Sequence, residues 1–169
     1  AIIDGESKTG VTTMYMAKGL DTGDIIEQSV VSIMSDDTGE TLTDKLAKTG
    51  AKLILSTLDK LENGTAERTV QNDDESCYAA MLSKDMGDID FTKPADEIER
   101  LVRGLQPWPC AFTRIKGKSV KIYGACVTDA PEGTEPGQIT GVTKKSFAIV
   151  CDGMGTGGRA AVDEVGGQA

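Results

Sequence analysis

The 169-residue chain contains no histidine. This absence excludes Ser-His-Asp and Cys-His catalysis within the chain, and it limits the general bases that the chain can supply to aspartate, glutamate, lysine, tyrosine and cysteine. Aromatic residues make up only 4% of the sequence, whereas 38% is hydrophobic. We therefore expect a globular protein with an aliphatic core, of a size that fits one ordinary domain or two small ones.

Closely spaced cysteine pairs are also missing. The four cysteines lie far apart, and none belongs to a C-x-x-C motif: Cys77, Cys110, Cys126 and Cys151. A zinc site in a chain without histidine depends on such pairs, and disulfide-stapled secreted domains are shorter and richer in cysteine. We predict four reduced thiols, no metal site and a cytoplasmic location.

The sequence has neither a membrane-spanning run nor a recognisable leader. No stretch is long and apolar enough to cross a bilayer, and residues 1–6 lack the basic region and apolar run of a signal peptide. The chain starts without methionine, at Ala1-Ile2-Ile3, which is typical of the interior of a helix or strand. We therefore expect an incomplete chain without a membrane partner.

Two strands and a long helix are predicted in the first half. Residues 11–16 and 25–33 are rich in strand formers, and their short connection is polar and contains glycine. Asp37 precedes Glu40 by three residues, as in a helix-capping pair, and Asn63-Gly64 supplies a stop signal. An apolar stripe between them, at spacings near three, four and seven, predicts a buried helix face: Leu42, Leu46, Leu53, Ile54, Leu58 and Leu61.

The second half has a different pattern. Residues 67–90 are polar and acidic, which indicates a linker, with one helical turn expected near 78–82. Pro94 suits the first turn of a second helix. Four strand-like segments with turns between them predict a small β-barrel or sandwich: 111–116, 119–127, 138–142 and 146–151. Residues 153–169 hold six glycines without periodicity, and we expect a disordered tail.

Basic residues are concentrated in one stretch of this acidic chain, whose net charge is −9. Residues 100–128 contain no acidic residue and six positive ones: Arg100, Arg103, Arg114, Lys116, Lys118 and Lys121. One interpretation is a solvated hairpin, turning at Gly117-Lys118, whose charges keep sheet edges apart. The other is a nucleic-acid-binding face.

Three segments in this order resemble the methionyl-tRNA formyltransferase family. TGVTTM at residues 9–14, followed by GLDTGD at 19–24, is similar to the second half of the family's catalytic domain. DTGETL at 37–42 leads into the helix, and LQPWP at 105–109 is similar to the start of the family's small C-terminal barrel. The first motif alone is shared by several folate-dependent formyltransferases. The resemblance covers about residues 1–152.

The resemblance implies a fold and a division of the chain. Residues 1–66 would be the C-terminal half of an α/β, Rossmann-like formyltransferase domain. Residues 67–90 would be a linker, residues 91–152 an incomplete OB-like β-barrel domain, and residues 153–169 the disordered tail.

The resemblance also implies an activity, the transfer of a formyl group from 10-formyltetrahydrofolate to the methionine amino group of initiator tRNA. The family uses an Asn, a His and an Asp. An Asn amide can donate to the oxyanion, a His can take the amine proton, and a carboxylate stabilises the charged imidazole. The family's catalytic Asp corresponds to Asp21 of this sequence, while the catalytic Asn and His would lie upstream of Ala1. The alternative is that Asp21 only caps its turn.

Binding residues follow from the same resemblance. Six residues would line the folate pocket: Gly19, Leu20, Asp21, Thr22, Gly23 and Asp24. Gly23 would allow the backbone to approach the pterin closely. Asp24 would alternatively only cap the turn. The six basic residues would contact tRNA phosphates and hydroxyls. We expect Trp108 to pack between helix and barrel rather than to stack on a base.

Two other functions stay open at this point. One is another folate enzyme, either a nucleotide-sugar formyltransferase or the hydrolase-like domain of formyltetrahydrofolate dehydrogenase. The other is a non-catalytic β-barrel that binds RNA, which a binding assay without folate addresses. We expect the intact protein to be a monomer that meets initiator methionyl-tRNA and the folate co-substrate.

Overall fold

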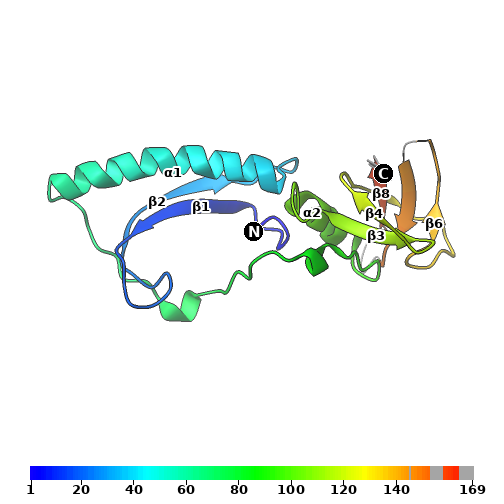
Figure 1. Ribbon diagram of the computed structural model, residues 1–169, viewed down its shortest axis with the longest axis horizontal. Helices are drawn as coiled ribbons and strands as arrows, with labels where there is room; N and C mark the ends of the chain where they lie inside the picture. The colour runs from blue at the N-terminus through cyan, green and yellow to red at the C-terminus, as the bar shows by residue number, and fades with distance from the viewer. Residues whose placement is uncertain (145, 153–157, 164–169) are drawn as a thin grey trace. The chain divides into compact units, whose positions relative to one another are not determined.

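The computed structural model describes residues 1–144, 146–152 and 158–163, and it divides into two compact units (Figure 1). Unit 1 comprises Ala1–Glu6, Ser35–Glu40 and the chain from Leu82 onward, and unit 2 comprises Ser7–Met34 and Thr41–Met81. The break after Met81 falls within the expected linker. Residues 1–66 do not form one unit, however, because two of their short segments belong to unit 1.

Unit 2 is built on the predicted pair of strands and the predicted helix. β1 (Lys8–Met14) and β2 (Ile25–Ser32) pair antiparallel, so that they form a hairpin. α1 (Gly39–Glu62) runs beside this hairpin for most of its length (Figure 1). The alternation of half-buried and exposed residues along both strands follows from this arrangement, because only one face of the hairpin meets the helix.

The predicted stop at Asn63-Gly64 is confirmed. Gly64 has a φ of +67°, the left-handed conformation that glycine adopts without steric cost. Its N–H donates to the carbonyl of Leu61 at 3.3 Å, and the N–H of Thr65 donates to the carbonyl of Lys60 at 2.9 Å. These two bonds form a Schellman motif, which satisfies carbonyls that the end of a helix leaves open.

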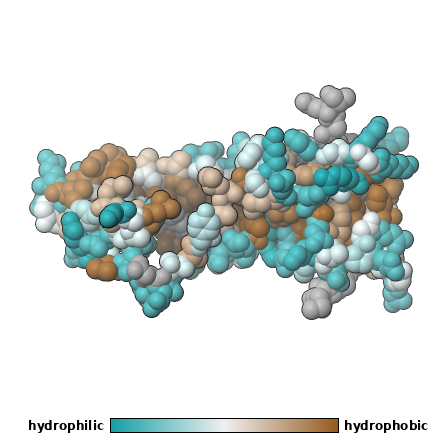
Figure 2. Space-filling model, turned by 60° about the horizontal axis from the view of Figure 1, so that its bottom comes forward, coloured by the Kyte–Doolittle hydropathy of each residue, from teal (hydrophilic) through white to brown (hydrophobic). Residues whose placement is uncertain are grey.

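The apolar stripe of α1, which we predict to be a core face, is buried only in part. Leu42 and Leu53 are buried, whereas the aliphatic side chains near the helix C-terminus are 41–64% exposed: Ile54, Leu55, Leu58 and Leu61. Hydrophobic residues, drawn in brown, are also visible on the surface at the left of Figure 2. Each large aliphatic side chain left in water forgoes roughly 1.5–3 kcal/mol, so burial stabilises unit 2 weakly.

The linker differs from its prediction in detail. No helical turn forms at residues 78–82. Instead, two short 3-10 turns lie on either side of that segment, η1 (Asp73–Glu75) and η2 (Lys84–Gly87).

Unit 1 contains the second predicted helix and a hairpin. α2 (Ala95–Gly104) begins directly after Pro94 and buries one face on the strands. β3 (Ala111–Ile115) and β4 (Lys118–Ile122) pair antiparallel across Lys116 and Gly117, whose φ values are +50° and +77°. Two left-handed residues define a type I′ turn, one residue earlier than predicted.

A four-stranded antiparallel sheet completes unit 1, in the order β5-β8-β7-β6. Its strands are β5 (Cys126–Asp129), β6 (Ile139–Thr140), β7 (Ser146–Val150) and β8 (Gly158–Asp163). The predicted strand 119–127 is therefore two strands. In the described residues the sheets stay separate, of two, two and four strands, and close no barrel.

β8 corrects the expectation of a disordered tail for residues 158–163; the rest of that tail lies outside the described residues. This strand sits between β5 and β7 and pairs with both. Its sequence, GRAAVD, carries little side-chain pattern. Its place in the sheet is defined by backbone pairing on two edges, which local sequence does not encode.

The core of unit 1 joins α2 to the strands. Its fully enclosed members have at most 9% exposure: Ile89, Ala95, Ile98, Val102, Ala111, Ile122, Phe147, Ile149 and Cys151. All four cysteines are free thiols, buried at Cys110 and Cys151 and exposed at Cys77 and Cys126.

Candidate active site

Asp21, the predicted catalytic residue, lies in the loop between β1 and β2. It is exposed, and its neighbour Leu20 is 85% exposed. Its φ of +54° is left-handed, a conformation that Asp and Asn tolerate better than other residues with a side chain. Such a backbone costs about 1–2 kcal/mol for most residues, so the loop needs contacts that hold it.

Two predicted folate-loop glycines are needed by the turn itself. A Cβ at Gly23 would overlap the carbonyl oxygen of Tyr15, and one at Gly19 would lie 2.6 Å from Oγ1 of Thr22. The close approach expected at Gly23 is thus made by the chain's own backbone. Next to it, the N–H of Tyr15 donates to the carbonyl of Asp24 at 2.9 Å, which closes the base of the loop.

A short segment after α1, residues 68–71, lies along this loop; we call it the strap. Thr69 joins β2 through two backbone hydrogen bonds of 2.8 and 3.0 Å. Nε2 of Gln71 donates to the carbonyl oxygens of Asp21 at 2.8 Å and of Gly23 at 2.6 Å. Nothing in the local sequence pattern predicted this contact, because 48 to 50 residues separate the partners.

Arg68 adds a second contact between the strap and the loop. Its guanidinium carbon lies 3.8 Å from the centroid of the Tyr15 ring, and Nη1 lies 3.5 Å from a carboxylate oxygen of Asp24. Cation–π stacking and an ion pair thus involve the same side chain. The Asp24 carboxylate has a structural partner, which fits its alternative role in shaping the turn.

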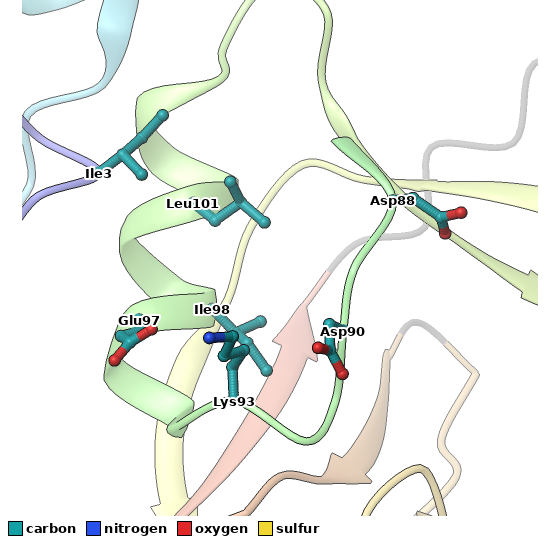
Figure 3. A pocket seen from close by; sticks show the side chains of 7 residues that line it. All are labelled: Ile3, Asp88, Asp90, Lys93, Glu97, Ile98 and Leu101. Atoms are coloured by element: carbon teal, nitrogen blue, oxygen red, sulfur yellow. The ribbon is translucent and has the colours of Figure 1, made fainter. Parts of the chain in front are cut away.

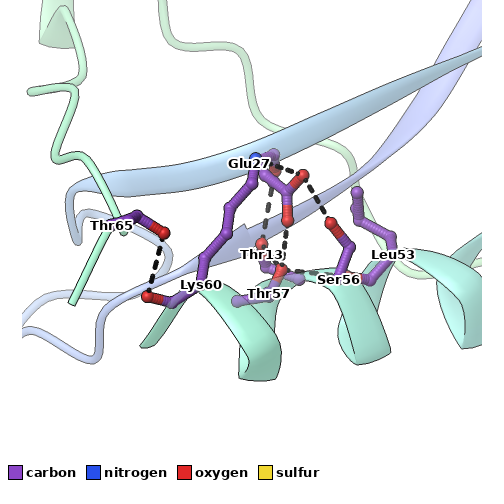
Figure 4. Close-up of polar contacts among 7 residues, drawn as sticks. All are labelled: Thr13, Glu27, Leu53, Ser56, Thr57, Lys60 and Thr65. Carbon is purple, nitrogen blue, oxygen red and sulfur yellow. Dashed lines mark hydrogen bonds and ion pairs between the residues drawn. The ribbon is translucent and has the colours of Figure 1, made fainter. Parts of the chain in front are cut away.

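A polar cluster fastens the hairpin to α1 (Figure 4). Glu27 on β2 accepts hydrogen bonds from Lys60 at 2.7 Å, Ser56 at 3.0 Å and Thr57 at 2.9 Å. The hydroxyls of Thr57 and Thr13 lie 2.8 Å apart. The Lys60 ammonium, followed by the Thr57 and Ser56 hydroxyls, lowers the pKa of Glu27 from 4.5, against the opposing effect of burial.

This cluster makes the stability of unit 2 sensitive to acid. Because the folded-state pKa of Glu27 lies below its unfolded value, its contribution is present above pH 4.5 and is lost as the pH falls through the folded-state pKa. We expect Glu27→Gln to lower the urea midpoint of unit 2 at pH 7 and to weaken its dependence on pH below 4.5. Amide signals of β1 and β2 report this midpoint. Equal pH dependence in both proteins would assign the acid sensitivity to other carboxylates.

A pocket of about 230 Å³ lies in unit 1 between α2 and the segment after η2 (Figure 3). Its floor is apolar and its rim carries three carboxylates and one lysine: Ile3, Asp88, Asp90, Lys93, Glu97, Ile98 and Leu101. Hydrogen bonds from Thr92 lower the pKa of Asp90, which favours its charged form. An acidic rim does not suit the carboxylate-bearing tail of a folate, so we do not place the folate site here.

The structure separates the six basic residues into two groups. On α2, Arg100 pairs with Asp96 at 2.7 Å and Arg103 pairs with Glu99 at 2.8 Å. Arg103 also donates to the backbone carbonyl of Asp37 at 2.7 Å. These half-buried guanidiniums hold unit 1 together, so they are poorly disposed to bind phosphate.

The other four basic residues lie on the β3–β4 hairpin. Arg114 pairs with Asp88 at 2.6 Å and stays 60% exposed. Three lysines are exposed and form no ion pair with any described residue: Lys116, Lys118 and Lys121. Lys121 lies opposite Phe112 on the face that also carries Arg114. Lys118 lies opposite Ile115 and so belongs to the other face of the hairpin, and Lys116 lies in its turn. These exposed basic residues of the hairpin are the basic surface that the structure leaves available.

Trp108 does not fill the role expected of it. Its side chain is 55% exposed, and Tyr123 is 40% exposed. The expectation of a packing plug is therefore wrong. The peptide bonds before the two prolines that flank Trp108, Gln106–Pro107 and Trp108–Pro109, are both cis.

No group of three or more potential ligand side chains comes together to hold a metal ion within the part of the chain that the structure describes. Likewise, neither helix among the described residues combines the length and apolarity needed to cross a bilayer.

The fold and its loop correspond to a known class of enzyme. The family model of the formyl transferases matches residues 1–58, and the model of their C-terminal domain matches residues 81–156. The chain belongs to the formyl transferase family.

Several curated proteins are similar to this chain in sequence. A methionyl-tRNA formyltransferase from Agathobacter rectalis is 49% identical over 149 residues, which are 88% of this chain and 48% of the relative. One from Clostridioides difficile is 43% identical over 148 residues, with the same coverage of 88% and 48%. The chain spans about half the length of the curated relatives it matches.

Solved structures show the same fold. An N-formyltransferase from Helicobacter canadensis, in complex with folinic acid and dTDP-3-aminofucose, superposes with a TM-score of 0.75 at 23% identity, over 96% of this chain and 58% of that one. HypX from Aquifex aeolicus, in complex with tetrahydrofolic acid, gives a TM-score of 0.67 at 18% identity, over 95% and 28%.

Proposed function

We propose that this chain forms part of a methionyl-tRNA formyltransferase, which transfers a formyl group from 10-formyltetrahydrofolate to the amino group of methionine on initiator tRNA. The observation that carries this proposal is the identity of 41–49% to relatives of that name, which extends through both matched domains. Solved neighbours in complex with folinic acid or tetrahydrofolic acid support a folate co-substrate.

The loop between β1 and β2 would be the chain's contribution to chemistry. The exposed carboxylate of Asp21 would orient and stabilise an imidazolium supplied by the family's histidine, which this sequence lacks. The loop from Gly19 to Asp24 would line the folate pocket, with exposed Leu20 as an apolar contact. In this scheme the chain alone does not catalyse transfer.

The two units would correspond to two parts of the complete enzyme. The hairpin and α1 would close the end of a Rossmann-like catalytic domain, and the strands of unit 1 would form an OB-like domain. The exposed side chains on α1, such as Ile54 and Leu58, fit a helix that has further cover in the complete domain. We also infer that the complete enzyme is a monomer located in the cytoplasm.

The exposed basic residues of the β3–β4 hairpin and its turn would meet the tRNA. Replacing Lys116, Lys118 and Lys121 with alanine is expected to weaken tRNA binding and to flatten its dependence on salt. The slope of log affinity against log salt should fall by about two to three, because each phosphate contact releases close to one counterion. Folate affinity should not change.

The matched control removes the same charge from unit 2, by changing Lys8, Lys48 and Lys52 to alanine. Titrations of tRNA at several salt concentrations compare the two triple variants with the wild type. If the hairpin variant behaves like the control, the basic residues of the hairpin form only a solvated surface.

A second candidate is a nucleotide-sugar formyltransferase. The Helicobacter canadensis neighbour is solved with dTDP-3-aminofucose, but its identity to this chain is 23%, against 49% for the Agathobacter rectalis relative. The comparison therefore favours tRNA as the acceptor.

The acceptor is tested with a joined protein, in which the first half of the Agathobacter rectalis relative is fused ahead of Ala1. It is given labelled 10-formyltetrahydrofolate and either initiator methionyl-tRNA or a dTDP-amino sugar. We expect formylated methionyl-tRNA and no formylated sugar. Formylation of the sugar alone would favour the second candidate.

A further inference from the structure

The backbone of its loop decides where the carboxylate of Asp21 can lie. Within the described residues this carboxylate has no hydrogen-bond or ion-pair partner, and the residue is exposed. The direction of its Cα–Cβ bond depends on the left-handed backbone at Asp21, whose φ is +54°. Whatever fixes that backbone therefore also sets the region that the carboxylate can reach.

Gln71 contacts this backbone directly. Its amide nitrogen donates to the carbonyl oxygen of Asp21 at 2.8 Å and to that of Gly23 at 2.6 Å. A primary amide carries two N–H groups, so one side chain can serve both carbonyls. Glutamate has the same size, yet when ionised it only accepts hydrogen bonds, and two carbonyl oxygens would face its charge.

The rest of the strap keeps Gln71 at this place. Thr69 is tied to β2 by a pair of backbone hydrogen bonds, and Arg68 is tied to Tyr15 and Asp24 at the base of the same loop. Gln71 thus extends from an anchored segment and reaches the loop across 50 residues of sequence. A free side chain on a mobile segment would lose more entropy on making such a bond.

We propose that Gln71 is a positioning residue for formyl transfer, which sets the region that the Asp21 carboxylate can reach by holding the carbonyls of Asp21 and Gly23. This inference rests on the proposed function, because it gives a role to the residue assigned there to catalysis. Gln71 itself touches no reacting atom in this scheme.

The contact is tested first in the 169-residue chain. Amide hydrogen exchange is measured by NMR for the wild type, Gln71→Glu and the control Gln28→Ala, which removes a glutamine bonded at 3.2 Å to Thr12 in the same hairpin. We expect Gln71→Glu to speed exchange of the Tyr15 amide, whose N–H donates to the carbonyl of Asp24 at the base of the loop, and to leave the middle of β1 unchanged. Exchange at Tyr15 equal to that of the control would overturn the proposal.

The role in catalysis is tested in the joined protein by a double-mutant cycle. At saturating folate and tRNA, Gln71→Glu should lower the rate constant of transfer roughly 10- to 100-fold, as expected for a misplaced catalytic group. In the Asp21→Asn background the same change should have almost no further effect, because Gln71 acts through the Asp21 carboxylate. An equal loss in both backgrounds would mean a general structural role and would overturn the proposal.

The exchange measurement and the double-mutant cycle distinguish a failure of this proposal from a failure of the proposed function. If the wild-type joined protein transfers no formyl group, the proposed function fails, whereas the exchange measurement still decides whether Gln71 holds the loop. If Gln71→Glu transfers at the wild-type rate while Asp21→Asn does not, the proposed function stands and the positioning role is wrong.

Discussion

Gly23→Ala is expected to disrupt the Asp21 loop and to destabilise unit 2 as a whole. The added Cβ would overlap the carbonyl oxygen of Tyr15, which is backbone and cannot rotate aside as a side chain can. The loop would lose the Tyr15–Asp24 hydrogen bond and the two carbonyl contacts of Gln71. We expect a loss of about 3 kcal/mol or more, at the upper end of what overpacking costs.

Chemical denaturation followed through the amide signals of β1 and β2 measures this loss. Gly50→Ala is the matched control, because it is the same substitution in α1 of the same unit, where the new Cβ would lie 3.4 Å from Cγ1 of Val11, an ordinary contact. It should stabilise the helix by about 0.5–1 kcal/mol. If Gly23→Ala leaves the midpoint unchanged, the loop geometry described above is incorrect.

Asp21→Asn is expected to remove most of the catalytic rate of the joined protein with little effect on folate binding. Asparagine tolerates a left-handed backbone as aspartate does, so the loop should keep its shape. The change removes the charge that would stabilise an imidazolium. We expect the turnover number to fall about 100-fold or more, within the range of general acid–base contributions, while the dissociation constant for folate changes by no more than a few-fold.

Asp59→Asn is the control for this prediction. It is the same substitution in the same unit, but Asp59 is an exposed residue of α1 outside the loop. Steady-state kinetics and folate titration of both variants give the comparison. Turnover of Asp21→Asn within a few-fold of the wild type would make Asp21 a structural residue of the turn.

Local patterns were sufficient to predict the helices and the first hairpin. The leucine spacing placed α1, and Asn63-Gly64 ended it where a left-handed glycine ends it in the structure. Strand-forming residues on either side of a glycine-containing turn placed β1 and β2. Each of these signals acts over a few residues, and packing did not override them.

Features that depend on distant partners were missed. β8 is defined by pairing with β5 and β7, although its own sequence is glycine- and alanine-rich. The basic stretch contains no acidic residue in sequence. In the fold, however, Asp88 forms a β-bridge with Phe112, and its carboxylate pairs with Arg114. Sequence alone had presented all six basic residues as one surface.

The same limit applies to the candidate site. Asp21 could be singled out from its motif, whereas the strap could not, since Gln71 carries no local signature and is joined to the loop only by folding. The Glu27 cluster is similar, because its donors on α1 lie 29 to 33 residues further along the chain.

The most direct measurement of the central claim is the initial rate of formylation of initiator methionyl-tRNA from 10-formyltetrahydrofolate. It compares the joined protein, the first half of the relative alone and the 169-residue chain alone at equal concentration. We expect product from the joined protein only, and little from its Asp21→Asn variant. Product from the first half alone, or from the 169-residue chain alone, would contradict the claim that the two halves share one active site.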